Sequence, residues 1–71
     1  MQKLGQNIQR IRNEKQITIK ELSNITQIRV EYLRKIESGK AYGVLLDKHL
    51  LKIAMGLNIK IKELFDFDII V

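Results

Sequence analysis

Cysteine, proline and tryptophan are absent from this chain, and aromatic residues make up only 6% of it. Without cysteine, neither disulfides nor thiolate metal sites are available, which fits a reducing compartment. No run of about 20 apolar residues occurs, so we expect no membrane span. The first residues alternate charged and apolar side chains and do not resemble a signal peptide, which favours a cytoplasmic location.

Side chains suited to catalysis or metal binding are also scarce. His49 is the only histidine, and with no cysteine or second histidine to share a metal it is most simply a surface or partly packed residue. No serine–histidine or paired-carboxylate arrangement has a spacing suited to catalysis. Gly39 and Gly43 lack the lysine spacing of a phosphate-binding loop. The sequence therefore predicts no enzyme activity, no cofactor and no metal.

The chain does have enough apolar residues for a core and an uneven charge. Its 71 residues make one small domain, and 45% of them are hydrophobic. Residues 1–40 carry nine basic and four acidic side chains, whereas residues 41–71 carry four of each sign. The whole net charge of +5 therefore lies in the first half. Such a surface attracts phosphate, although a solvated lysine-rich face is the simpler alternative on charge alone.

Apolar residues recur at helical spacing throughout the chain and predict five helices with short connections, hence an all-α fold. The expected ranges are 3–15, 19–25, 29–38, 45–57 and 61–65. We expect Ile19, Leu22 and Ile25 to face inward from the second helix. We expect Ile61, Leu64 and Phe65 to reach the core from the last one.

Several residues mark where these helices begin and end. Thr18 followed by Glu21 is a capping box, in which each residue satisfies a backbone N–H of the other. Gly39 and Asn58 stand where a left-handed residue would end the third and fourth helices. Residues 26–28 form the turn between the second and third helices. Two short helices joined by a tight turn, the second one basic, are the layout of a helix-turn-helix that enters the DNA major groove.

Four segments resemble one family in the right order and at close to the right spacing: LGQNIQRIR, TIKELS, QIRVEYLRKIESGK and LLKIAMGLNIKIKELF. Residues 4–65 resemble the Cro/CI-type (XRE) helix-turn-helix domains of phage repressors and bacterial regulators. The resemblance implies a compact five-helix, lambda-repressor-like domain over residues 1–65 from a bacterium or phage. It further implies a small transcriptional regulator, more readily a repressor than an activator, which binds double-stranded DNA without a cofactor.

The resemblance also implies which residues act. The third helix would be the recognition helix, with Arg34 and Lys35 as the best candidates for guanine or phosphate contacts. Arg12 and Glu37 match an ion pair that would tie the first helix to the third, the alternative being two independent surface charges. The full set of residues expected at the DNA is Ile19, Lys20, Arg29, Val30, Glu31, Arg34, Lys35, Lys40 and Tyr42.

Some positions depart from the family pattern. Ile19 replaces a frequent glutamine, Gln27 replaces the usual glycine of the turn, and Arg29 replaces a serine or threonine cap. Glu31 places a negative charge on the expected DNA face. The string SNITQIRVEYLRKIESG is also similar to RodZ-type N-terminal domains, which bind an actin-like cytoskeletal protein and continue to a membrane span not seen here. A protein-interaction module, RodZ-like or antitoxin-like, is therefore the alternative function.

Residues 66–71, DFDIIV, form a tail without helical periodicity. Its apolar residues either fold back over the core or form a self-association surface, with Phe67, Ile69 and Val71 on one side of an added strand. We expect a homodimer, and a two-fold helix-turn-helix dimer reads a pseudo-palindromic operator.

Overall fold

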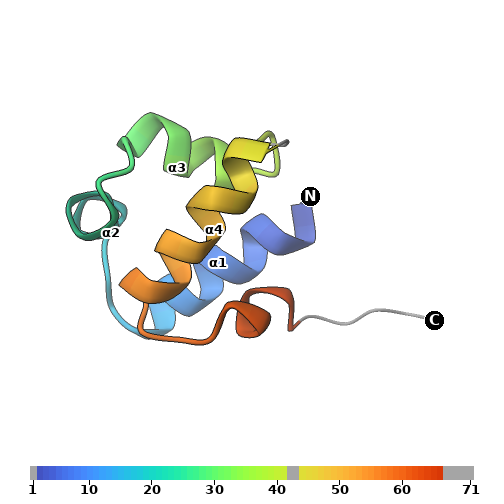
Figure 1. The fold of residues 1–71 in the computed structure, drawn as a ribbon. Helices are drawn as coiled ribbons and strands as arrows, with labels where there is room; N and C mark the ends of the chain where they lie inside the picture. Colours follow the sequence, from blue (N-terminus) through green and yellow to red (C-terminus); the bar gives the residue numbers. More distant parts are fainter. Residues whose placement is uncertain (1, 42–43, 67–71) are drawn as a thin grey trace.

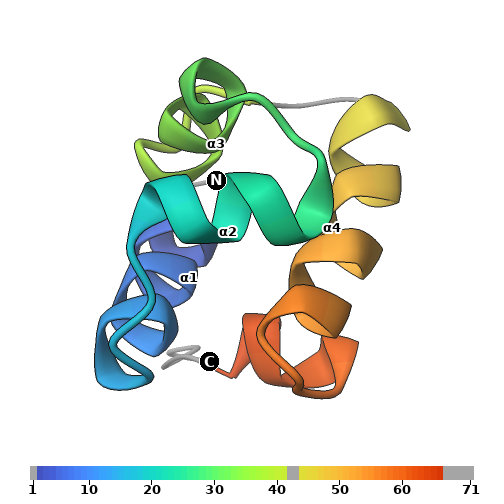
Figure 2. The ribbon, with the colours of Figure 1, turned by 90° about the vertical axis from the view of Figure 1, so that its left-hand side faces the viewer.

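The computed structural model describes residues 2–41 and 44–66, which form four α-helices and one short 3₁₀ segment. These are α1 (Gln2–Glu14), α2 (Ile19–Thr26), α3 (Val30–Glu37), α4 (Val44–Gly56) and η1 (Ile61–Phe65) (Figure 1). Figure 2 shows α2 crossing in front of α1 and α4, with α3 above it and η1 below it. The predicted all-α class is confirmed, and no strand occurs in the described part of the chain.

A single apolar core lies between the helices. Leu4, Ile8 and Ile11 are buried along one stripe of α1, as their helical spacing predicts. Leu22 of α2 and Leu33 of α3 are fully buried beneath them. The remaining buried apolar residues are Ile28, Ile36, Ala41, Leu46, Leu50, Ile53, Ala54, Leu57 and Leu64. Helices of eight residues are marginal alone in water, so packing against this shared core is what stabilises α2 and α3.

Three helices end with the same hydrogen-bond arrangement. After α3, Gly39 has φ 80°, and the amide of Lys40 donates to the carbonyl of Lys35 at 2.9 Å. This is the Schellman motif that the glycine predicts. Asn58 ends α4 in the same way with φ 59°, and Gln16 ends α1 with φ 58°. Asparagine was expected at such a position, whereas the sequence gives no signal for glutamine there.

The first helix approaches the end of α3 unusually closely, and Gly5 permits this. A Cβ atom at position 5 would lie 2.3 Å from the Ile36 carbonyl oxygen and 2.5 Å from that of Glu37. Backbone atoms cannot yield at that distance, so any side chain here would push the two helices apart. The absence of a side chain at Gly5 therefore sets the position of α3 relative to α1.

The expectation that Ile25 faces inward is wrong, because its side chain is 56% exposed. The buried stripe of α2 runs instead through Leu22 and Thr26, one helical turn apart. Thr26 tolerates burial because its hydroxyl donates to the Leu22 carbonyl at 2.7 Å. Ile25 lies beside this stripe and faces the end of α4, where Gly56 leaves room for it.

The last segment also differs from the expectation. It is a 3₁₀ segment, and Ile61 and Phe65 are 42% and 40% exposed rather than part of the core. Leu64 is buried, and Phe65 points about 120° away from it, because successive residues of a 3₁₀ helix are rotated by that angle. Ile61 lies three positions before Leu64 and on the same side, so its exposure shows that the core does not extend to the start of the segment. The amide of Asn7 holds the segment by donating to the carbonyls of Glu63 at 3.0 Å and Leu64 at 2.8 Å. Within residues 2–41 and 44–66, no helix is long and apolar enough to cross a membrane.

Candidate DNA-binding surface

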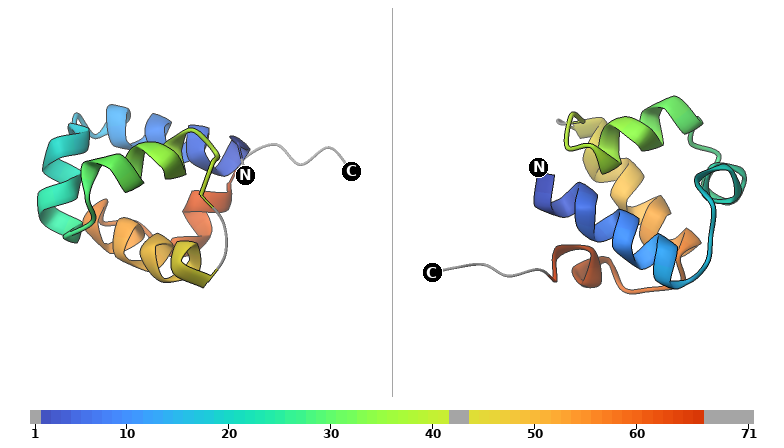
Figure 3. Two further views of the ribbon diagram at one scale, coloured as in Figure 1. Left: turned by 90° about the horizontal axis from the view of Figure 1, so that it is seen from above. Right: turned by 180° about the vertical axis from the view of Figure 1, so that it is seen from behind.

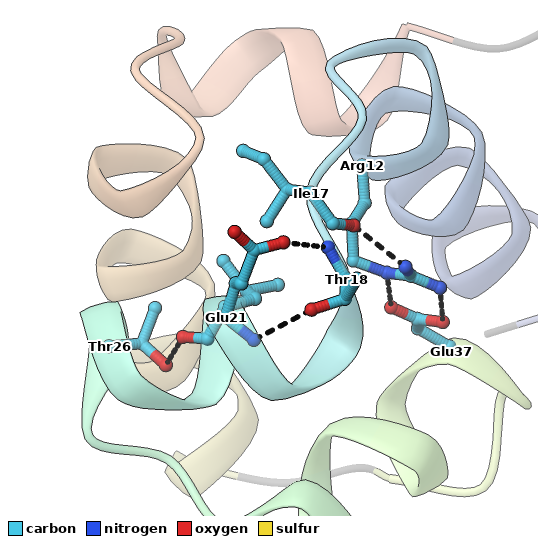
Figure 4. Close-up of polar contacts among 7 residues, drawn as sticks. Arg12, Ile17, Thr18, Glu21, Thr26 and Glu37 are labelled. Atoms are coloured by element: carbon cyan, nitrogen blue, oxygen red, sulfur yellow. Dashed lines mark hydrogen bonds and ion pairs between the residues drawn. The ribbon is translucent and has the colours of Figure 1, made fainter.

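The start of α2 is fixed by the predicted capping box. The amide of Glu21 donates to the Thr18 hydroxyl at 3.0 Å, and the amide of Thr18 donates to the Glu21 carboxylate at 2.9 Å (Figure 4). These backbone and hydroxyl hydrogen bonds lower the pKa of Glu21 below its usual value. The cap sets the direction in which Ile19 and Lys20 leave the first turn of α2.

The turn between α2 and α3 is closed by polar groups rather than by glycine. Gln27 adopts the left-handed conformation at φ 61° and ψ 27°, and its backbone N–H donates to the Ser23 carbonyl at 2.8 Å. The Ser23 hydroxyl reaches across the turn to the Ile28 carbonyl. The Gln27 side chain donates to the Asn24 carbonyl at 2.7 Å. A non-glycine residue in this conformation costs roughly 1 kcal/mol of backbone strain.

The start of α3 has no side-chain cap. Arg29 occupies the N-cap position, and its side chain makes no capping hydrogen bond. Arginine lacks an acceptor oxygen for the free N–H groups of the first turn, so these groups are open to another acceptor such as a phosphate oxygen. The exposed guanidinium of Arg29 stands at the same end of the helix.

The expected pair between Arg12 and Glu37 is present and largely buried. Arg12 Nε donates to Glu37 Oε2 at 2.8 Å, and Nη2 donates to Oε1 at 3.1 Å. The remaining guanidinium nitrogen, Nη1, donates to the carbonyl of Ile17 at 2.9 Å (Figure 4). One side chain of α1 is thereby bonded both to the last residue of α3 and to the connection that precedes α2. The pair orients the helix-turn-helix against α1.

A shallow depression brings the start of α2 and the exposed side of α3 together. It has a volume of about 300 Å³ and is lined by Gln9, Arg12, Ile19, Arg34, Glu37 and Ser38. Ile19 and Arg34, which are 15 positions apart in the sequence, therefore lie on one surface. Gln9 and Ser38 also lie there. The sequence gives no separate signal for these two polar residues, although both lie within segments that resemble the family.

The candidate contact residues of α3 fall into two groups. Glu31, Arg34 and Lys35 are exposed, whereas Val30 is half-buried. Lys20 and Lys40 are exposed on either side of α3 in the sequence, and Ile19 is half-buried. Within the described ranges, no hydrogen bond or ion pair occupies the cationic groups of this surface. These groups are Lys20, Arg29, Arg34, Lys35 and Lys40. Tyr42 lies outside the described residues, as do Phe67, Ile69 and Val71.

An aromatic contact that the sequence did not predict supports α3 from the other side. The rings of Tyr32 and His49 lie 4.8 Å apart at an interplanar angle of 69°, an edge-to-face arrangement. Nδ1 of His49 is buried without a hydrogen-bond partner. Burial, and to a smaller extent the nearby charge of Lys52, lower the pKa of His49. No cluster of three potential metal ligands occurs within residues 2–41 and 44–66.

A family model described as the Cro/C1-type HTH DNA-binding domain matches residues 7–68 of the chain. The chain therefore belongs to this family of DNA-binding domains, as the sequence motifs indicated. It is a family of regulatory DNA-binding domains and not of enzymes.

Among solved structures, the chain is similar to the restriction-modification controller protein C.AhdI from Aeromonas hydrophila. The two share 28% sequence identity with a TM-score of 0.81, over 90% of this chain and 94% of the other. No curated protein matches the chain in a sequence search.

Proposed function

We propose that this protein recognises a specific double-stranded DNA sequence through α3 and regulates transcription from it. Arg34 and Lys35 would contact guanine or phosphate, supported by Arg29 and Lys40. Residues 1–65 would form the DNA-binding domain, acting in the cytoplasm as a homodimer on a pseudo-palindromic operator. Repression is favoured over activation, because a domain that occupies a promoter blocks polymerase without any further contact.

One observation supports this proposal above the others. Five cationic side chains lie in or beside the helix-turn-helix, and no internal hydrogen bond or ion pair within 2–41 and 44–66 neutralises them. Exposed cations without acidic partners repel one another, so they favour a polyanion that releases counterions on binding. The similarity to a restriction-modification controller protein agrees with a regulatory role.

The arginine of α3 provides the sharpest test. Replacing Arg34 with alanine should weaken binding to a selected operator by about 1–3 kcal/mol, or roughly 5- to 150-fold, if Arg34 reads a guanine. Fluorescence anisotropy with labelled operator duplexes measures this loss. The unaltered chain should also lose affinity steeply with added salt.

Arg10 provides a matched control. Arg10→Ala removes the same charge and the same side chain as Arg34→Ala. In the structure, Arg10 donates to the Asn7 side chain at 2.6 Å, and Asn7 in turn holds η1. Arg10 therefore lies on the η1 side of α1. Arg10→Ala should change affinity only slightly. An Arg34→Ala loss within about threefold of the Arg10→Ala loss would remove α3 as the reading helix.

Glu31 favours a second candidate function, a protein-interaction module of the antitoxin-like or RodZ-like kind. Its carboxylate is exposed on α3 and forms no ion pair in the described part of the chain. A carboxylate here repels phosphate, although it can accept a hydrogen bond from cytosine N4. Selection from random duplexes separates the two candidates. Enrichment of no DNA site, with no salt-dependent binding, would favour a protein partner.

A further inference from the structure

An apolar groove lies between α2 and α4, on a part of the molecule that the DNA-binding proposal does not use. Its volume is about 460 Å³, and it is lined by Ile25, Thr26, Gln27, Lys52, Met55 and Gly56. Met55 is 72% exposed and Ile25 is 56% exposed, which is unusual for two large apolar side chains on adjacent elements. We call this surface the α2–α4 groove.

We propose that the α2–α4 groove receives residues 67–71 of a second copy of the chain. In an extended conformation, Phe67, Ile69 and Val71 fall on one side and would meet Ile25 and Met55. This inference rests on the self-association part of the proposed function and adds the surface that accepts the tail.

Charge agrees with this occupant. The tail segment carries Asp66 and Asp68 and no cation. Lys52 is exposed at the groove and is its only charged lining residue within the described part of the chain. One lysine beside an apolar floor suits an apolar segment with acidic residues at its start.

The geometry favours a second copy over the chain's own tail. In Figure 1 and in the left panel of Figure 3, η1 ends toward the side of the molecule opposite α2. Five extended residues span at most about 18 Å. A tail leaving η1 would have to use its length to pass around the domain before it reached Ile25 and Met55. A neighbouring copy faces no such detour.

A two-fold pair satisfies both tails at once. The right panel of Figure 3 shows the molecule after a half turn about the vertical axis of Figure 1. α3 remains at the top in both views, while the end of η1 moves to the side on which α2 lies in Figure 1. A two-fold axis that is vertical in Figure 1 therefore places the end of η1 of one copy on the same side as α2 of the other. The contact is then reciprocal and closed, with both α3 helices on one side.

A mixing experiment tests the proposal with two complementary variants. A chain ending at Asp66 keeps the groove and loses the tail, and it retains every described core residue. Met55→Lys keeps the tail and places a charge in the groove. In sedimentation equilibrium each variant alone should self-associate about tenfold or more weakly than the unaltered chain, as expected when a central apolar contact is lost. Mixed together, they should associate, because one contact can still form.

Ile61→Lys is the matched control, since Ile61 is also an exposed apolar residue but lies on η1. It should leave self-association unchanged. Association that survives Met55→Lys, or that is lost in Ile61→Lys instead, would overturn the proposal, and so would a mixture that remains monomeric. An unaltered chain that is monomeric would overturn it as well.

A labelled peptide of residues 66–71 gives a second readout that does not depend on the association of two folded chains. It should bind the chain ending at Asp66 and not bind the same chain carrying Met55→Lys. Absence of binding to the first chain would contradict the proposal. DNA binding is a separate measurement, made on a half-site with the chain ending at Asp66. If neither this chain nor the unaltered chain bound DNA, the proposed function would be refuted, and the sedimentation result would not be affected.

Discussion

Replacing Glu37 with glutamine should destabilise the domain strongly, even though the side chain keeps its shape. In the structure, Glu37 accepts two hydrogen bonds from Arg12, at 2.8 and 3.1 Å, and both side chains are largely buried. Glutamine removes the negative charge and leaves the guanidinium in the interior with only the Ile17 carbonyl as an acceptor of full strength.

The size of the effect follows from the cost of an unpaired buried charge. Breaking a buried ion pair by removing one partner typically costs about 3–5 kcal/mol. A domain of this length has a total free energy of unfolding of roughly 4–11 kcal/mol. The substitution should therefore remove roughly a quarter or more of the stability. It should also loosen the attachment of α3 to α1, and so reduce DNA affinity.

Urea unfolding followed by far-UV circular dichroism measures this loss, and the chain has its own control. Arg10 and Glu14 form a pair at 2.9 Å whose side chains are 52% and 62% exposed. Glu14→Gln removes the same charge at the surface and should cost less than about 0.5 kcal/mol. If Glu37→Gln costs no more than Glu14→Gln, the buried pair does not hold the domain together. Combining Glu37→Leu with Arg12→Met should recover most of the loss, because no unpaired charge remains.

Two further substitutions test the turn and the support of α3. Gln27→Gly should stabilise the domain by about 1 kcal/mol by relieving the left-handed strain, whereas Gln9→Gly within α1 should destabilise it by a similar amount; urea midpoints decide both. His49 has a lowered pKa in the folded state, so the unfolded chain binds more protons. Stability should therefore fall as the pH drops below about 6.5, the pKa of an unperturbed histidine. Thermal unfolding between pH 7.5 and 5.5 should show this fall in the unaltered chain and little of it in His49→Gln, and a pH-independent Tm in both would contradict the assignment.

Much of the fold could be predicted because its signals are local. The helical spacing of Leu4, Ile8 and Ile11, the capping box at Thr18 and the left-handed residue Gly39 each depend on neighbours within a few positions. All three appear in the structure as expected. The ion pair of Arg12 with Glu37 is a long-range contact, and only the family resemblance indicated it.

The errors have a common cause. The apolar character of Ile25 predicts an inward side chain, but the direction of a side chain on an eight-residue helix depends on which neighbours cover it. Ile61 and Phe65 are apolar as well, but of the three apolar residues in this 3₁₀ segment the core covers only Leu64. The edge-to-face contact of Tyr32 with His49 had no sequence signal, since it joins residues from two helices. The DNA contacts remain predictions, because which exposed cations meet phosphate depends on the nucleic acid.

The Schellman endings of α1, α3 and α4 bear on how quickly the chain finds its native state. Each one closes through a carbonyl only five positions earlier, so each can form as soon as its own helix has formed. Because no proline occurs, peptide-bond isomerisation contributes no slow phase lasting tens of seconds. A helical domain dominated by such short-range contacts is expected to refold within microseconds to milliseconds. The regulator would then regain its shape well within the time that a ribosome needs to add a single residue.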